Sequence, residues 1–253
     1  MDRLWALAME PASLWLFAVV LVAATVRGFT GFGAGLVFLP FGGALIGPRA
    51  AVIVMWTIDT LPTLPILLPA LRHADYRSVL PAAAAAAIAV PLGAHVLTSL
   101  DPTLFRWGVS TLVLALALLL FSGLRFTGPR RPGSAFGVGL VSGFLGGATQ
   151  LSGPPLVLYW MSGTETAAQV RANLIVFFAF STVVSGLAYF ANDLFTAEAL
   201  MRAALAAPIY LAGILLGQRL FTLAPERLFR AVAITIIVAA AILALPVFDG
   251  ALR

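Results

Sequence analysis

The sequence contains no cysteine and no lysine, and only two histidines, His73 and His95. Without cysteine the chain forms neither disulfides nor thiolate metal sites, and it has no cysteine nucleophile. Two histidines are too few for most transition-metal centres in a chain that has no thiolate ligand to add to them. We therefore expect no bound metal and no cofactor.

Charged residues are also scarce. They make up 10% of the 253 positions, whereas hydrophobic residues make up 61%, and a soluble domain is roughly 25% charged. The mean hydropathy is +1.04. The net charge of +5 comes from arginines gathered in short loops, a distribution typical of membrane topology and not of a nucleic-acid-binding face. These features predict an all-α polytopic protein of the cell (inner) membrane that binds no nucleic acid.

Catalytic motifs are missing from the sequence as well. It has no phosphate-binding loop of the Gly-x-x-x-x-Gly-Lys-Ser/Thr type, no His-Glu-x-x-His pair and no serine nucleophile with a suitable histidine. We expect no catalytic residues and no enzymatic activity. An ATP-driven pump would need a partner chain.

One glycine-rich stretch occurs twice. The first copy is GFTGFGAG at 28–35, and the second is GFLGGATQLSGPP at 143–155. One shift aligns Gly28 with Gly143 and Gly31 with Gly146. Later in each half, Leu-Gly at 92–93 and Leu-Phe-Arg at 104–106 recur at 216–217 and 228–230. The chain therefore divides into two homologous transmembrane repeats, 1–127 and 128–253, within one integral membrane domain.

Each glycine-rich stretch interrupts an apolar run. Residues 13–46 as one helix would be about 50 Å long, too long to span a bilayer without steep tilt. We predict that each half contains a Gly-broken helix or a re-entrant hairpin, followed by three transmembrane helices. The distribution of arginines between the loops favours opposite, inverted topologies for the two halves.

Two short helices that begin just after Gly33 and Gly153 would direct unpaired N–H groups into the protein, and such helix ends bind anions. Broken segments at matching places in two halves point to a transporter's binding site. The alternative is that the glycines serve close helix packing. The candidate substrate-binding residues are Thr30, Gly31, Gly33, Gly146, Gly147, Gln150, Ser152, Gly153, Arg171 and Asn173.

Ionisable residues inside apolar segments form a second set of candidates, because a charge in the bilayer is costly. Asp59 is either a proton carrier or the partner of Arg27 in an ion pair. Arg27 either adds positive charge to an anion path or extends to the membrane interface. Arg171 either meets the substrate or is an ordinary arginine at the end of a loop.

The paired motifs resemble the TauE/SafE sulfite-exporter family of membrane permeases. The resemblance rests on the stretches 28–35 and 143–147, on SGPPLVLY at 152–159 and on RANL at 171–174, and it extends from about 12 to 245. Many members carry three glycines ahead of the second proline, where this chain has Gln150-Leu151-Ser152-Gly153.

The resemblance implies a secondary transporter, usually an exporter, of small sulfur-containing anions such as sulfite, sulfonates or sulfoacetate. We expect alternating access around a site near the bilayer midplane. Export would run as a uniport or be coupled to protons, and the protein would act as a monomer or a homo-oligomer. The alternatives are an anion channel, an importer of another small organic anion, and a non-transporting scaffold subunit.

Overall fold

The computed structural model of the protein describes residues 7–30, 33–122, 126, 128, 131–163, 165–223 and 226–248. The regular structure of these residues is helical, without a strand. Six of the described helices are long and apolar enough to cross a membrane. The predicted all-α, multi-pass membrane class is therefore confirmed.

In chain order the elements are α2 (Pro11–Thr30), α3 (Ala34–Ile46), α4 (Pro48–Leu71), α5 (Tyr76–Ser99), α6 (Pro102–Phe121), α7 (Pro132–Thr149), α8 (Gly153–Met161), α9 (Ala167–Ala191), α10 (Ala197–Leu223), α11 (Glu226–Leu243) and the short 3-10 helix η1 (Pro246–Phe248).

The helices group into two compact units. The first contains Met1–Ile58, Leu100–Leu118 and Phe195–Arg253, and the second contains Asp59–Ser99 and Leu119–Leu194. Helix α4 passes from the first unit into the second. Pro62 lies four residues after Ile58 in this helix and has no N–H, so the Ile58 carbonyl lacks its usual helical partner. The unit boundary thus falls where the hydrogen-bond ladder of α4 is incomplete.

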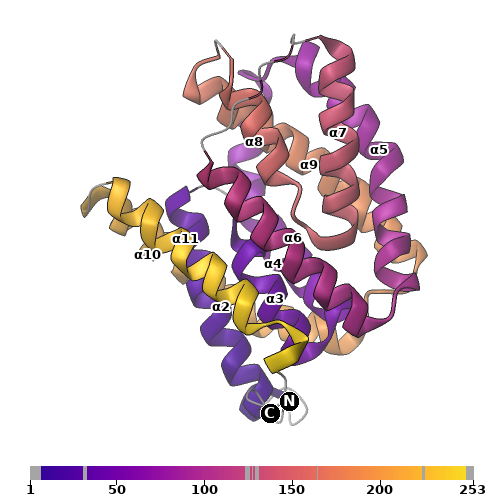
Figure 1. The fold of residues 1–253 in the computed structure, drawn as a ribbon, viewed down its shortest axis with the longest axis vertical. Coiled ribbons are helices and arrows are strands. Elements are labelled where there is room, and N and C mark those ends of the chain that lie inside the picture. The colour runs from indigo at the N-terminus through magenta and orange to yellow at the C-terminus, as the bar shows by residue number, and fades with distance from the viewer. Residues whose placement is uncertain are drawn as a thin grey trace. The chain divides into compact units, whose positions relative to one another are not determined.

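In the second unit, α5 packs closely along α7, as Figure 1 shows. The contact face of α7 carries Gly139, Gly143 and Gly147, which are spaced four residues apart and therefore lie on one side of the helix. A Cβ at Gly147 would overlap the carbonyl oxygen of Val90 in α5. Small residues allow two helix backbones to approach closely inside a membrane. These glycines are therefore required by the α5–α7 contact.

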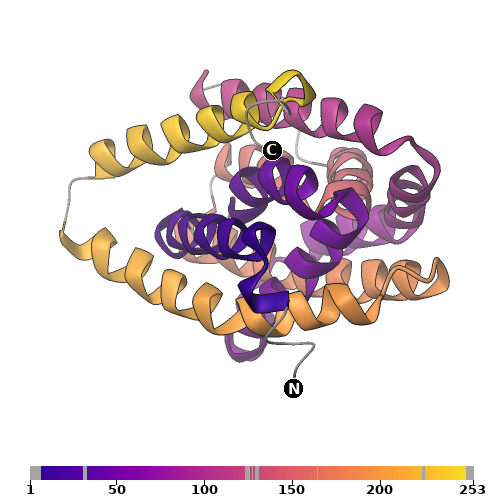
Figure 2. The ribbon, with the colours of Figure 1, turned by 90° about the horizontal axis from the view of Figure 1, so that it is seen from below.

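In the first unit, α2 packs against α10 in a similar manner (Figure 2). A Cβ at Gly28 would overlap the carbonyl oxygen of Ile214, and a Cβ at Gly213 would lie 2.6 Å from the Cβ of Ala24. Two glycines, one on each helix, therefore make this contact possible.

The two glycine contacts correspond in the duplicated sequence. Gly28 in α2 aligns with Gly143 in α7, and the Leu-Gly pairs place α5 and α10 at equivalent positions. Each unit therefore combines the glycine-bearing helix of one sequence half with a partner helix of the other half. The repeat boundary at 127/128 and the inverted orientation of the halves remain predictions.

Polar contacts anchor the ends of several helices. In the first unit, the buried Arg202 of α10 donates to Glu10 at 2.7 Å, to Glu198 at 2.9 Å and to the hydroxyl of Ser13 at 2.8 Å. Glu10 directly precedes α2, so this cluster joins the beginning of α2 to the beginning of α10.

An aromatic cluster forms much of the core of the second unit. The ring centroids of Tyr159 and Trp160 in α8 are 6.3 Å apart, and those of Trp160 and Phe177 in α9 are also 6.3 Å apart. The indole N–H of Trp160 donates to the hydroxyl of Ser78 in α5 at 2.8 Å. The core therefore holds α5, α8 and α9 together around Trp160.

Candidate functional site

The second glycine-rich stretch forms a helical hairpin within the second unit. Helix α7 ends at Thr149 and α8 begins at Gly153. The hydroxyls of Ser134, near the start of α7, and Tyr159, near the end of α8, are hydrogen-bonded at 3.1 Å, so the two helices run in opposite directions (Figure 1). The chain break lies after Gly146, which is still part of α7. This half therefore forms a helical hairpin, and its re-entrant placement in the membrane stays a prediction.

The turn of the hairpin is fixed by Gln150 and Tyr189. Gln150 has φ 55°, a left-handed conformation that costs a non-glycine residue about 1 kcal/mol. Its backbone N–H donates to the carbonyl of Gly146 at 2.9 Å, and its side-chain Nε2 donates to the same carbonyl at 3.1 Å and to the Tyr189 hydroxyl at 2.8 Å. The Tyr189 hydroxyl in turn donates to the carbonyl of Gly147 at 2.8 Å. Both N–H groups of the Gln150 side-chain amide are therefore already hydrogen-bonded within the protein.

Gly146, Ser152 and Ser181 lie together beside this turn. A Cβ added to Gly146 would be 3.1 Å from the Cβ of Ser152 and 3.5 Å from the hydroxyl oxygens of both Ser152 and Ser181. Ser152 is 8% exposed and Ser181 is 6% exposed, and neither hydroxyl is hydrogen-bonded to a described residue. Two hydroxyls, one at the N-cap of α8 and one in α9, thus approach the same backbone position of α7.

The first turn of α8 provides few backbone donors. Its first residue, Gly153, carries an N–H, but Pro154 and Pro155 follow and have none. The side chain of Ser152, at the N-cap, makes no capping hydrogen bond. Donors at this helix end are therefore the Gly153 amide and the Ser152 hydroxyl.

The equivalent break in the first unit separates α2 from α3. Thr30 is the last residue of α2, and its side chain, together with Gly31, lies outside the described residues. Gly33 has φ 93° and caps α3, which begins at Ala34 as expected. Only glycine adopts this φ at little cost. The first turn of α3 contains no proline, so Ala34 and Gly35 keep their N–H groups, while the N–H of Leu36 donates to the carbonyl of Gly33 at 3.1 Å.

The other predicted residues are placed separately. Arg171 is exposed on α9, whereas Asn173 is fully buried and its side-chain oxygen accepts the N–H of Asp75 at 2.7 Å. Asp75 immediately precedes α5, so Asn173 anchors the start of that helix. Arg27 is half-buried in the last turn of α2 and Asp59 is half-buried at the start of the second unit. The proposed pairing of Arg27 with Asp59 stays a prediction.

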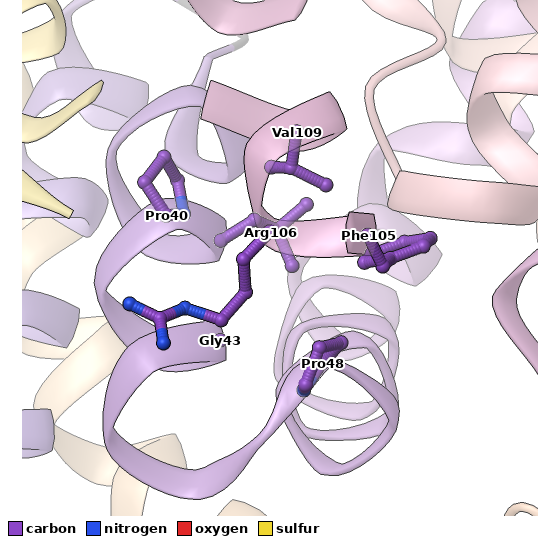
Figure 3. A pocket seen from close by; sticks show the side chains of 7 residues that line it. Pro40, Gly43, Pro48, Phe105, Arg106 and Val109 are labelled. Carbon is purple, nitrogen blue, oxygen red and sulfur yellow. The ribbon is translucent and has the colours of Figure 1, made fainter. Parts of the chain in front are cut away.

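A small pocket in the first unit was not anticipated from the sequence. It lies between α3, the start of α4 and α6 (Figure 3), and Arg106 extends along it past Gly43. The guanidinium of Arg106 donates to the carbonyl of Ala244 at 3.2 Å. Because this arginine is bound to the chain segment after α11, its evident role is to hold α6 to that segment. The pocket lining is Leu39, Pro40, Gly43, Pro48, Phe105, Arg106 and Val109.

Sequence reasoning also missed Ser181 and Tyr189. Together with Ser185 they are spaced four residues apart on α9, so they form a polar line along one face of an otherwise apolar span. That spacing was the available signal. Among the described residues no group of His, Cys, Asp or Glu is arranged to hold a metal ion.

Comparison with known proteins agrees with this architecture. The family model described as "Sulfite exporter TauE/SafE" matches residues 16–244. A relative from Cupriavidus necator, named "Probable sulfite/organosulfonate exporter TauE", is 29% identical over 201 residues, which cover 75% of this chain and 77% of the relative. No solved structure matches the chain. The protein therefore belongs to the sulfite exporter TauE/SafE family of membrane transporters.

Proposed function

We propose that the protein is a secondary transporter that exports small sulfur-containing anions, of the sulfite or organosulfonate class, across the cell membrane. The observation that carries the proposal is the family match over 16–244, supported by the name of the Cupriavidus necator relative. An inside-negative membrane potential favours exit of an anion by about 2.3 kcal/mol per charge per 100 mV. Export therefore needs no nucleotide.

Each helix break supplies candidate binding residues within its own unit. In the second unit, the Ser152 hydroxyl and the Gly153 N–H supply hydrogen-bond donors next to Gly146, whose missing side chain leaves room. Gln150 positions the turn, because both of its amide N–H bonds are already used within the protein. Gly147 has a packing role in this proposal, because it allows α7 to approach α5 closely.

In the first unit, Gly33 and the first turn of α3 form the corresponding donor group, with Thr30 and Gly31 beside them in the sequence. The positive end of a helix favours an anion without a side-chain charge. A site made of neutral donors holds the anion without a countercharge that would slow its release.

Alternating access is the proposed mechanism, and α4 is the connection that supports it. This helix continues from one compact unit into the other, and its ladder lacks a hydrogen bond where they join. Asp59 lies at this junction and is our candidate for proton coupling. Asn173 is a structural anchor for α5 in this proposal, and the exposed Arg171 attracts anions to the protein surface.

Reconstituted liposomes test the function directly. Purified protein is incorporated into vesicles loaded with radiolabelled sulfite, and efflux is measured with and without an inside-negative potassium diffusion potential set by valinomycin. The proposal expects saturable efflux that the potential accelerates, and labelled sulfite exchange that external unlabelled sulfite stimulates. Efflux that does not saturate and shows no exchange would indicate a channel. Flux of acetate without flux of sulfite or methanesulfonate would reject the proposed substrate class.

A further inference from the structure

We propose that three serine hydroxyls, those of Ser142, Ser152 and Ser181, form the group that contacts the oxygens of the transported anion in the second unit. This inference rests on the proposed function, because it adds a selectivity mechanism to the same helix break. Only Ser152 was identifiable from the glycine-rich motif, since the other two serines lie inside helices α7 and α9.

The first argument is convergence. Ser152 at the N-cap of α8 and Ser181 in the middle of α9 are both within 3.5 Å of the position that a Cβ of Gly146 would occupy. Two residues from different helices therefore face one small volume beside the α7 backbone. Ser142 lies four residues before Gly146, so it shares the same face of α7 one turn earlier.

The second argument is that the hydroxyl of Ser142 lacks a partner among the described residues although it is buried. Ser142 is 0% exposed and its hydroxyl oxygen makes no hydrogen bond. Serine and threonine within helices usually bond a carbonyl of the preceding turn, as Thr149 does with Leu145 and Ser185 does with Thr182. A buried polar group without a partner is costly. The unpartnered hydroxyl of Ser142, one helical turn before Gly146, is explained if a ligand supplies the acceptor atom.

The chemistry of the three groups defines the ligand. All are neutral donors, and Gly146 and the nearby turn add no acidic side chain, so the site accepts a negatively charged group without repelling it. A sulfite ion or a sulfonate headgroup presents three oxygens in a pyramidal arrangement, one for each hydroxyl. A carboxylate is planar and presents two oxygens, so it leaves one donor unsatisfied. The serines therefore favour sulfur oxyanions over carboxylates.

Single substitutions of these serines test the inference, with a matched control on α9. Ser142→Ala, Ser152→Ala and Ser181→Ala are each expected to raise the KM for sulfite and for methanesulfonate about tenfold, the size expected when one hydrogen bond to a charged group is lost. The selectivity for methanesulfonate over acetate should fall by a similar factor. Ser185→Ala removes another buried serine one turn from Ser181, but one whose hydroxyl already donates to the Thr182 carbonyl, so the KM of this variant should stay within about twofold of the wild-type value.

The thermal stability of the ligand-free protein gives a second, independent readout. Removing a hydroxyl that has no partner should leave the Tm unchanged or raise it, whereas Ser185→Ala should lower it. Addition of methanesulfonate should then stabilise the wild type and the Ser185 variant more than the three serine variants.

Cysteine substitution covers the case in which an alanine variant fails to fold. Because the chain has no cysteine, Ser181→Cys creates a single thiol of similar size, and methanesulfonate should protect it from a maleimide. Wild-type KM and selectivity in all three alanine variants, or labelling of the thiol that methanesulfonate leaves unchanged, would overturn the inference while sulfite flux persists. If the wild type itself carries no sulfite or sulfonate, the proposed function fails and the inference fails with it.

Discussion

The side-chain amide of Gln150 donates to the hydroxyl of Tyr189 at 2.8 Å, and that hydroxyl donates to the carbonyl of Gly147, also at 2.8 Å. The bonds connect the middle of the hairpin turn to α9 across the end of α7. Tyr189 is fully buried, so water is not available to replace them. This connection keeps Gln150 in its left-handed conformation and places Ser152 next to Gly146.

Tyr189→Phe is expected to lower the free energy of unfolding by about 1–3 kcal/mol, because it leaves the Gln150 N–H and the Gly147 carbonyl without a partner. Thermal unfolding of the purified protein measures this change. The double variant Tyr189→Phe/Gln150→Ala should lose less stability than the sum of the losses in the two single variants, since both residues belong to one hydrogen-bond network. Tyr76→Phe is the control, because the Tyr76 hydroxyl donates to the Leu71 carbonyl at an exposed position where water can replace it, so its loss should be nearly neutral. Additive effects at Gln150 and Tyr189 would contradict the coupling.

Gly147→Ala should destabilise the protein by about 1–3 kcal/mol or more, since the new methyl group would overlap the backbone of Val90 and force α5 and α7 apart. Gly137→Ala provides a control on the same helix. Nothing lies within 4 Å of the Cβ that it adds, and alanine favours a helix over glycine by up to about 1 kcal/mol, so this variant should be slightly more stable. Equal melting temperatures for both variants would show that the α5–α7 contact tolerates side chains.

The sequence predicted the helical membrane class and both helix breaks, because apolar length and glycine content are local properties. It placed the start of α3 after Gly33 correctly and the start of α8 within one residue. Two things could not be read from it. The grouping of α2 with α10 and of α5 with α7 depends on which surfaces are complementary, and that is a property of the folded chain. The approach of Ser181 to Gly146 likewise depends on the rotation of α9, which its apolar composition does not fix.

In the Arg202 cluster, removal of the two carboxylates should destabilise the protein more than removal of the guanidinium. The Arg202 side chain is 6% exposed, whereas those of Glu10 and Glu198 are 45% and 56% exposed. The double variant Glu10→Gln/Glu198→Gln leaves a buried guanidinium without a countercharge and should cost about 3–5 kcal/mol. Arg202→Met leaves two carboxylates that water can hydrate, so its cost should be smaller, about 1–2 kcal/mol. Thermal unfolding at pH 7 ranks the variants, and a larger loss for Arg202→Met would contradict this account of the cluster.

Pro62→Ala tests whether α4 bends during transport. The substitution restores the N–H that pairs with the Ile58 carbonyl, at the residue where α4 leaves the first unit. If α4 bends at this point during transport, the restored hydrogen bond should stiffen the helix there. The maximal rate of sulfite efflux from liposomes should then fall severalfold while the KM stays unchanged, because the proposed binding residues are untouched.

Pro208→Ala makes the same change inside α10, which lies wholly within the first unit, and should leave the rate near the wild-type value. A Pro62 variant that transports as fast as the Pro208 variant would remove α4 as the flexible connection, and the conformational change would have to be sought in another segment.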